Sequence, residues 1–328
     1  MRHLRWAYCG NFGPEHSTEN HVRQAIEARG DEITLIQEDD PKAWDLLIDS
    51  VDEYDLILWT STGGMAESIG QQRQWRMLTA ARNAGVPTVG LHLDRWWGLE
   101  REAQVWERPF FRCEFVCTAD GGHQEQFASV GVNHFWLPPA VSKPETEPGR
   151  HRNGFDSELV FVGSWQPGYH AEWKHRPELI NWLNRKYRNR IKFWPQPGKH
   201  AVRGQDLRDL YASARVVIGD SCLSGGATHY WSDRIPETVG RGGFLIHPEV
   251  EGLSDHYTVG EHLLTWPIGE WGTLQNTIDR ALANPEMRAQ VSAAGREHVR
   301  TFHTYDVRIE QILDISGVRM LAGKDQMR

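Results

Sequence analysis

The chain has 328 residues, of which 39% are hydrophobic and 24% are charged, and its formal net charge at pH 7 is −8. This length and composition predict a globular protein of two domains. No apolar run approaches the roughly 18–20 residues that a membrane-spanning helix needs, so we expect no membrane partner, and the negative charge excludes a general polyanion binder.

The first part of the chain alternates short apolar runs with longer helical patterns. We expect strands at residues 3–9, 33–36, 55–59, 86–91, 115–118 and 135–137. We expect helices at residues 18–29, 41–50, 70–84 and 122–130. The first helix has Ser17 or Thr18 as its N-cap and Gly30 as its stop. Because the first run is short and lacks a small-residue cleavage site, it predicts a strand and not a signal peptide.

Residues 138–157 interrupt this alternation with Pro138, Pro139, Pro144 and Pro148, which is a linker composition. The alternation then restarts. We expect strands at residues 159–163, 191–194, 214–219, 243–247 and 262–265. We expect helices at residues 171–187, 205–213, 234–240, 270–283 and 285–300, and a last helix from about residue 303.

Strands separated by helices in this way predict an α/β protein with two Rossmann-like βαβ domains facing across a cleft. The expected boundaries are an N-terminal, acceptor-side domain at 1–140, a linker at 141–157 and a C-terminal domain at 158–302. Residues 303–328 are expected to form a helix that packs back toward the first domain.

The four cysteines, Cys9, Cys113, Cys117 and Cys222, lack the spacing of a zinc or redox site. We expect buried free thiols, which suit a reducing cytoplasm.

The segment from Arg234 to Ile246 combines a short helix, a glycine break and an apolar strand. Glu237 on that helix can accept two hydrogen bonds from a ribose diol, and the glycines let the backbone approach a nucleotide closely. An ordinary helix-to-strand connection with glycine at the helix end is the alternative.

Several segments of the second half resemble the C-terminal domain of group 1 glycosyltransferases, particularly the CgeB-like branch, which has the GT-B fold. The matching segments are Val160–Ser164, Leu210–Val217, Arg234–Leu245 and His303–Arg308. The first half is similar to bacteriophage glycosyltransferases at Gly13–Glu19, His92–Asp94 and Thr118–His123. The resemblance implies a host-cytoplasmic enzyme if the protein is phage-encoded.

The resemblance implies a nucleotide-sugar donor, with UDP favoured, and no separate cofactor. It places Glu237 on the ribose as the second acid of an E-x7-E pair, while His229 stands where the first acid is expected. The further donor-binding residues are expected to be Gly163, Ser164, Trp165, Trp194, Ser232 and Arg234. Trp194 is expected near the base, where stacking on the ring and a place in the core are both open.

Transfer from such a donor needs stabilisation of the leaving diphosphate. The chain has Asp39-Asp40 but no clear metal-binding Asp-x-Asp, so we expect metal-independent chemistry in which cations and helix N-termini meet the phosphates. Arg234 and the Lys174/Arg176 pair are the candidate cations, and ordinary surface roles are the alternative for each.

The candidate catalytic residues are Asp94 as general base and His92 as its partner, because both directly follow a predicted strand. A turn or helix cap is the alternative for Asp94. The candidate acceptor-binding residues are His16, Trp96, Trp97, Asp120 and His123. A cap is also the alternative for Asp120, surface exposure is the alternative for His16, and a place in the core is the alternative for the tryptophans.

Residues 170–203 contain nine Lys or Arg and two Glu. A solvated helix face explains this excess, and an anionic acceptor explains it equally. Together with this excess, the resemblance of the first half to bacteriophage glycosyltransferases implies a hydroxymethylated pyrimidine base in phage DNA as the acceptor. A small molecule, a glycan and a protein remain as other acceptors, and a non-catalytic nucleotide-sugar-binding module, a sugar-nucleotide epimerase and a phosphorylase remain as other functions. The phosphorylase would need a pyridoxal lysine, for which the chain has no motif.

Overall fold

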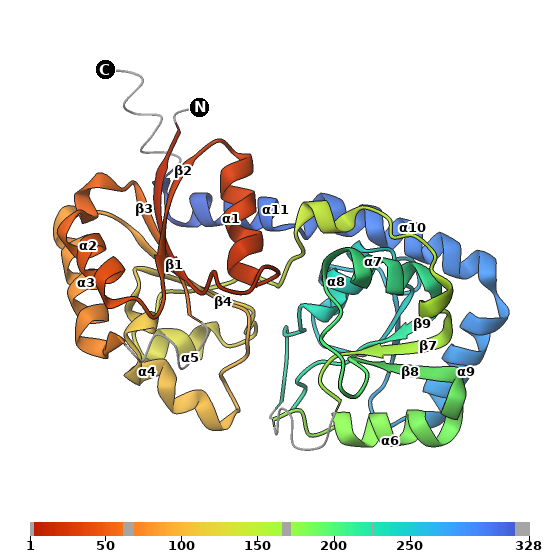
Figure 1. Ribbon diagram of the computed structural model, residues 1–328. Coiled ribbons are helices and arrows are strands. Elements are labelled where there is room, and N and C mark those ends of the chain that lie inside the picture. Colours follow the sequence, from red (N-terminus) through yellow and green to blue (C-terminus); the bar gives the residue numbers. More distant parts are fainter. Residues whose placement is uncertain (1–2, 62–68, 166–171, 225, 319–328) are drawn as a thin grey trace. The chain divides into compact units, whose positions relative to one another are not determined.

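The computed structural model of the chain describes residues 3–61, 69–165, 172–224 and 226–318 (Figure 1). The chain divides into two compact units. Unit 1 comprises Met1–Pro138 and Tyr305–Arg328, and unit 2 comprises Pro139–Thr304. Among the described residues, no helix has the length and apolar character to cross a membrane.

Unit 1 is built on a six-stranded parallel sheet with the order β2-β1-β3-β4-β5-β6. Its strands are β1 (Arg5–Gly10), β2 (Glu32–Gln37), β3 (Leu56–Thr60), β4 (Thr88–His92), β5 (Phe115–Thr118) and β6 (His134–Trp136). Its helices are α1 (Thr18–Ala28), α2 (Pro41–Asp49), α3 (Gln71–Ala84), α4 (Gln104–Glu107), α5 (Gln124–Ser129) and α11 (Tyr305–Ile315).

Unit 2 is built on a five-stranded parallel sheet with the order β11-β10-β9-β7-β8. Its strands are β7 (Ser157–Val162), β8 (Ile191–Trp194), β9 (Ala214–Ile218), β10 (Leu245–Pro248) and β11 (Leu264–Trp266). Its helices are α6 (Arg176–Tyr187), α7 (Gly204–Ser213), α8 (Arg234–Gly240), α9 (Trp271–Ala283) and α10 (Pro285–Phe302). The predicted class, two Rossmann-like α/β domains, is therefore confirmed.

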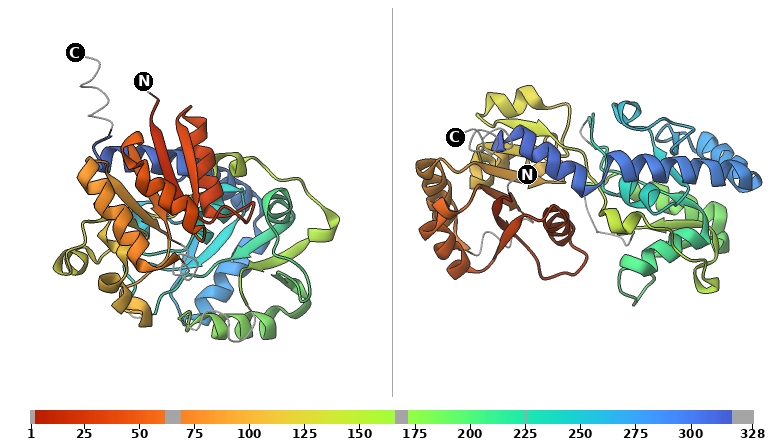
Figure 2. Two further views of the ribbon diagram at one scale, coloured as in Figure 1. Left: turned by 60° about the vertical axis from the view of Figure 1, so that its left-hand side comes forward. Right: turned by 90° about the horizontal axis from the view of Figure 1, so that it is seen from above.

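The helix ends follow local chemistry. Ser17 caps α1, because its side chain accepts a hydrogen bond from the backbone N–H of Asn20. Gly85 ends α3 in the left-handed conformation that glycine adopts without strain. The last helix, α11, lies against α1 within unit 1 (Figures 1 and 2), where Glu310 forms an ion pair with Arg29.

One helix begins later than expected. The pattern predicted a helix over 171–187, but α6 begins at Arg176, and residue 171 lies outside the described residues. Pro177 explains the later start, because proline fits the first turn of a helix and disrupts its interior.

The sheet order fixes where ligands are expected. In unit 2 the chain moves from β7 to β8 on one side and then to β9 on the other side of β7. Ligands of open parallel sheets bind beside such a reversal, at the carboxyl ends of the strands. The loops that follow β7 and β9 therefore flank the expected site of unit 2.

Candidate functional site

The loop after β7 begins with Gly163, whose φ angle of +149° is a conformation that other residues rarely adopt. Ser164 and Trp165 follow it. The indole Nε1 of Trp165 donates a hydrogen bond of 2.8 Å to the carbonyl of Pro195, which follows β8. This bond ties the loops after β7 and β8 together.

A cavity of about 350 Å³ lies at these loops. Its lining residues are Val162, Gly163, Ser164, Trp165, Pro195, Ala201, Val202, Arg203 and Arg234. Four of the predicted donor-binding residues thus share one cavity, which has the size of a small-ligand pocket. Apolar walls with two arginines suit a ligand that has a flat ring and negative charges.

Trp194 is not among the residues that line this cavity. Its side chain is buried, and its ring packs edge-on against Phe155 with 5.4 Å between the ring centroids. The cavity wall thus contains the indole of Trp165 and not that of Trp194.

Arg234 and Glu237 lie on one face of α8. Arg234 Nη1 is 3.4 Å from the Glu237 carboxylate, and their side chains are 19% and 16% exposed. Burial disfavours the charged guanidinium, but the carboxylates of Asp233 and Glu237 outweigh it and raise the pKa of Arg234. Arg234 therefore presents a permanent positive charge to the cavity, with Glu237 one turn further along the helix.

Arg176, a predicted phosphate ligand, is occupied by the protein itself. Its Nε donates to the buried Asp220 carboxylate at 2.9 Å and its Nη1 donates to the Ser164 carbonyl at 3.0 Å. Its guanidinium also lies 3.6 Å from the centroid of the Trp173 ring. Burial lowers the pKa of Arg176, although Asp220 opposes the shift. These contacts favour a structural role for Arg176, in which it fixes the loop after β7 to the loop after β9.

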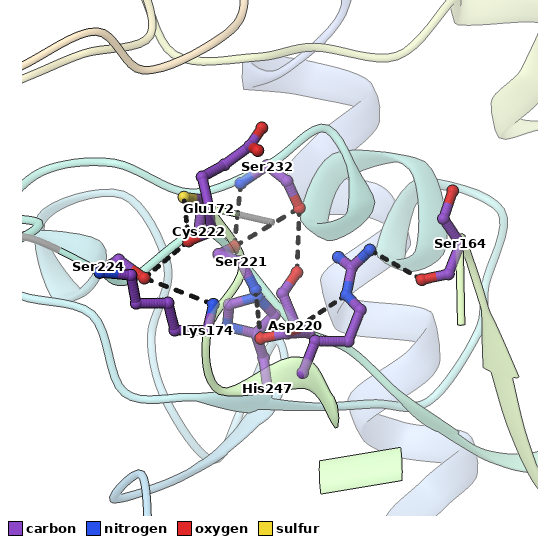
Figure 3. A network of polar contacts seen from close by, with 10 residues as sticks. Ser164, Glu172, Lys174, Asp220, Ser221, Cys222, Ser224, Ser232 and His247 are labelled. Atoms are coloured by element: carbon purple, nitrogen blue, oxygen red, sulfur yellow. Dashed lines mark hydrogen bonds and ion pairs between the residues drawn. The ribbon is translucent and has the colours of Figure 1, made fainter. Parts of the chain in front are cut away.

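The entry to α8 is held by a chain of hydrogen bonds (Figure 3). His247 Nδ1 lies 2.8 Å from the Pro248 carbonyl, which only accepts, so Nδ1 carries the proton. Burial lowers the pKa of His247 to about 4, so Nε2 is an acceptor for the Ser221 hydroxyl at 2.9 Å. The Ser221 oxygen in turn accepts from the backbone N–H of Ser232, and the Ser232 hydroxyl donates to the Asp220 carbonyl. Ser232 therefore fixes the start of α8, and its hydroxyl group is used by the protein itself.

Replacing Ser221 with alanine is expected to lower the free energy of unfolding by about 1–3 kcal/mol, because the buried N–H of Ser232 loses its acceptor. Urea unfolding measures this change. The exposed control substitution Ser254→Ala should leave stability unchanged, and an equal effect of the two substitutions would contradict the role assigned to Ser221.

In unit 1, the predicted residues His92 and Asp94 lie at the carboxyl end of β4. The His92 ring is buried, and its Nδ1 accepts a hydrogen bond of 3.0 Å from the backbone N–H of Asp94. The Asp94 side chain is 58% exposed, and its carboxylate lies 3.6 Å from Arg101. The structure thus brings the pair together, with His92 orienting the loop and Asp94 facing solvent.

Burial lowers the pKa of His92 to about 4, although Asp94 opposes the shift. In the unfolded chain His92 binds a proton near pH 6.5, whereas in the folded chain it does not. The stability that neutral His92 contributes is therefore lost as the pH falls from about 6.5 to 4. His92→Gln should reduce the slope of the unfolding free energy in this range by about 1.4 kcal/mol per pH unit. The exposed control His200→Gln should leave the slope unchanged, and equal slopes in His92→Gln and wild type would exclude a buried neutral His92.

In unit 1, Asp120 fixes the backbone of Trp96 and Trp97. The Asp120 carboxylate accepts the backbone N–H groups of Trp96 and Trp97, each at 2.9 Å. The alternative role of Asp120 as a helix cap is wrong, because α5 begins at Gln124 and no side chain caps it. Burial raises the pKa of Asp120 against the effect of these two hydrogen bonds.

The acceptor contacts predicted for the tryptophans and Asp120 are not supported, because all three side chains are buried. Trp96 packs on His92, and Trp97 packs on Phe127. His123 lies 3.9 Å from Asp120, and burial lowers its pKa. In the same segment Trp106 is 46% exposed, so it is the better candidate for a ring that contacts an acceptor.

His16 lies in the loop between β1 and α1 and is exposed. Its ring is 6.3 Å from that of His21. In the sheet of unit 1, β3 separates β1 from β4. His16 is therefore on the carboxyl edge with Asp94 but two strands away.

Sequence reasoning missed Arg203 in the cavity wall and the Asp220–Ser221–His247 network. No local motif marks Arg203. Asp220 and Ser221 directly follow an apolar strand, and polar residues at that position are a usable signal in a parallel sheet. A buried carboxylate pair in unit 1, Glu19 and Glu38, was also missed, and burial together with Glu38 raises the pKa of Glu19.

Comparisons with known proteins agree with this fold. HepE from Anabaena, solved in complex with UDP and glucose, matches with a TM-score of 0.61 and 13% identity, over 95% of this chain and 99% of that chain. Sucrose-phosphate synthase from Thermosynechococcus elongatus matches with a TM-score of 0.64 and 12% identity, over 98% of this chain and 100% of that chain. An alpha-glucosyltransferase in complex with UDP and a 13-mer DNA matches with a TM-score of 0.64 and 9% identity, over 97% of this chain and 100% of that chain.

At these identities the likeness establishes the GT-B fold alone. Comparison with curated protein sequences finds no match. A family model described as "Glycosyl transferase-like" matches residues 149–314, which include both sides of the cavity and the whole of α8. Since this match spans just over half of the chain, the protein belongs to the glycosyl transferase-like family.

Proposed function

We propose that this protein transfers a sugar from a UDP-sugar to a hydroxyl group and needs no metal ion. The observation that carries the proposal is the cavity of about 350 Å³ at the strand reversal of unit 2, which Arg203 and Arg234 line. The complexes of HepE and of the alpha-glucosyltransferase with UDP support the choice of nucleotide.

In the proposed reaction the acceptor oxygen forms a bond to the anomeric carbon as the bond to the β-phosphate oxygen breaks. UDP leaves with the electron pair, and Arg234 stabilises its charge. Glu237 accepts the ribose hydroxyls, and the Trp165 indole lies beside the base. The acceptor proton goes to Asp94, which is the exposed carboxylate at the end of β4.

Titration with UDP, followed by donor hydrolysis in the presence and absence of a chelator, tests this function. We expect saturable UDP binding and slow hydrolysis of UDP-glucose that a chelator does not change. UDP binding without hydrolysis of any UDP-sugar would favour a non-catalytic nucleotide-sugar-binding module. Loss of activity on chelation would contradict the metal-independent mechanism.

For the acceptor we propose DNA that carries a hydroxymethylated pyrimidine. This choice rests on the resemblance of the first half to bacteriophage glycosyltransferases. The alpha-glucosyltransferase solved with DNA supports this choice. A small molecule, a glycan and a protein are the other acceptors to be tested.

The basic residues that suggested DNA do not form one stripe. Lys174, Lys199 and Arg203 follow β7 and β8 and therefore lie on the carboxyl-edge side of the sheet, where Arg203 lines the cavity. Arg185, Lys186 and Arg188 lie at the end of α6, next to the beginning of β8, and therefore at the opposite edge of the sheet. The ion pair of Arg190 with Glu158, near the start of β7, confirms this location. The residues relevant to an acceptor at the cavity are thus the first group.

If DNA is the acceptor, its affinity should fall steeply with salt, since each phosphate contact adds to the dependence. Lys199→Glu should weaken DNA binding, while Lys186→Glu, at the other edge, should change it less. Fluorescence anisotropy with hydroxymethylated and unmodified duplexes measures both effects. Transfer to a neutral small molecule, with no DNA affinity at low salt, would exclude DNA as the acceptor.

A further inference from the structure

Unit 2 contains a second cavity, of about 750 Å³, away from the cavity beside Arg234. It is lined by Ser157 and Ala214, the first residues of β7 and β9, and by Arg288 and Ser292 of α10. Because the amino ends of parallel strands share one edge, this cavity lies at the opposite edge of the sheet from the proposed donor site. Nothing in the proposed reaction uses it.

Two arginines face this second cavity without acidic partners. Within the described part of the chain, neither Arg215 nor Arg288 has a carboxylate within 4.0 Å. Arg288 donates to the carbonyls of Ala281 and Leu282 through Nη1. Burial, followed by the positive charge of Arg215, lowers the pKa of Arg288.

The acids of the same cavity are already paired. Glu158 forms an ion pair with Arg190 at 2.6 Å, and Asp156 contacts His151 at 2.5 Å. Because these acids contact other residues, Arg215 and Arg288 are the charged side chains of the cavity that stay available to an anion.

One face of α10 extends the polar wall. Arg288 and Ser292 are four residues apart and so lie one above the other on the helix. Arg288 and Ser292 thus contribute a guanidinium group and a hydroxyl group to this wall.

We propose that this cavity binds a small ligand that carries phosphate groups. Guanidinium groups donate two parallel hydrogen bonds to phosphate oxygens, and hydroxyl groups such as that of Ser292 complete the contacts. Both Arg215 and Arg288 line the cavity, so one anion could be bound between elements β9 and α10. The volume admits a sugar phosphate or a short polyphosphate chain.

Isothermal titration of the full chain at low salt, with inorganic tripolyphosphate and with glucose 6-phosphate in separate arms, tests the proposal. We expect binding that Arg215→Gln weakens by about 10-fold or more, which is the scale of a charged hydrogen bond. Arg215 is exposed and donates no hydrogen bond in the described structure, so this variant should fold normally. The exposed control Arg280→Gln on α9 should bind as the wild type does.

Tighter binding of glucose 6-phosphate would identify the ligand as a phosphorylated metabolite, and tighter binding of tripolyphosphate would identify it as a polyphosphate. The variant Arg234→Gln separates this site from the donor site. If Arg234→Gln abolishes binding and Arg215→Gln leaves it unchanged, the anion binds at the donor cavity and the proposal is overturned. Absence of binding in both arms overturns it as well, and neither result depends on glycosyl transfer.

Discussion

Asp94→Asn is expected to lower turnover by about 100-fold or more and to leave UDP affinity unchanged, because an amide cannot take the acceptor proton. The Asp94 side chain is 58% exposed at the end of β4, and its contact with Arg101 is a surface contact of 3.6 Å. Asparagine has nearly the same shape, so the loop should keep its conformation. Steady-state rates and UDP titration, measured on the same preparation, separate the two effects.

The matched control is Asp40→Asn, an exposed helix cap in the same unit, which should leave turnover unchanged. Equal turnover of Asp94→Asn and wild type would remove Asp94 from the mechanism. Asp120 is a poor replacement, because its carboxylate holds the backbone of Trp96 and Trp97. The buried pair of Glu19 and Glu38, with the raised pKa of Glu19, would then be the next candidate for a proton acceptor.

Glu237→Ala is expected to weaken UDP binding by about 2–3 kcal/mol, or roughly 30- to 150-fold in the dissociation constant, the scale for a charged hydrogen-bonding group. The protein should remain folded, because the two arginines that contact Glu237 keep other acidic residues nearby. Arg241 stays paired with Glu145 at 3.1 Å, and Asp233 still acts on Arg234. Titration with UDP measures the loss, and thermal unfolding checks the fold.

Glu237→Gln sharpens the test, since glutamine keeps the size of the side chain and one acceptor oxygen. It should lose part of the UDP affinity and lie between the alanine variant and the wild type. Unchanged UDP affinity in Glu237→Ala would show that Glu237 is a structural partner of Arg234 and not the ribose anchor.

The sequence predicted most strands and helices because their signals are local. A short apolar run between two helical patterns buries its side chains best as a strand of a parallel sheet that has helices on both faces. The glycine after α3 and the serine before α1 fixed helix ends through backbone conformation and hydrogen bonding that neighbouring residues supply. The start of α6 was misplaced because the helical pattern was extended through Pro177.

The roles of single polar and aromatic residues depended on contacts between distant segments. Sequence alone determined two α/β domains, because the alternation of strands and helices is a local pattern. The resemblance to glycosyltransferases supplied the grouping of Gly163, Ser164, Trp165 and Arg234, which the structure places around one cavity. Only the tertiary structure decided that Arg176 is held by Asp220 and that Asp120 holds the backbone of two buried tryptophans. Burial and hydrogen-bond partners come from segments far apart in the chain, and no local pattern encodes which charged side chain a fold will enclose.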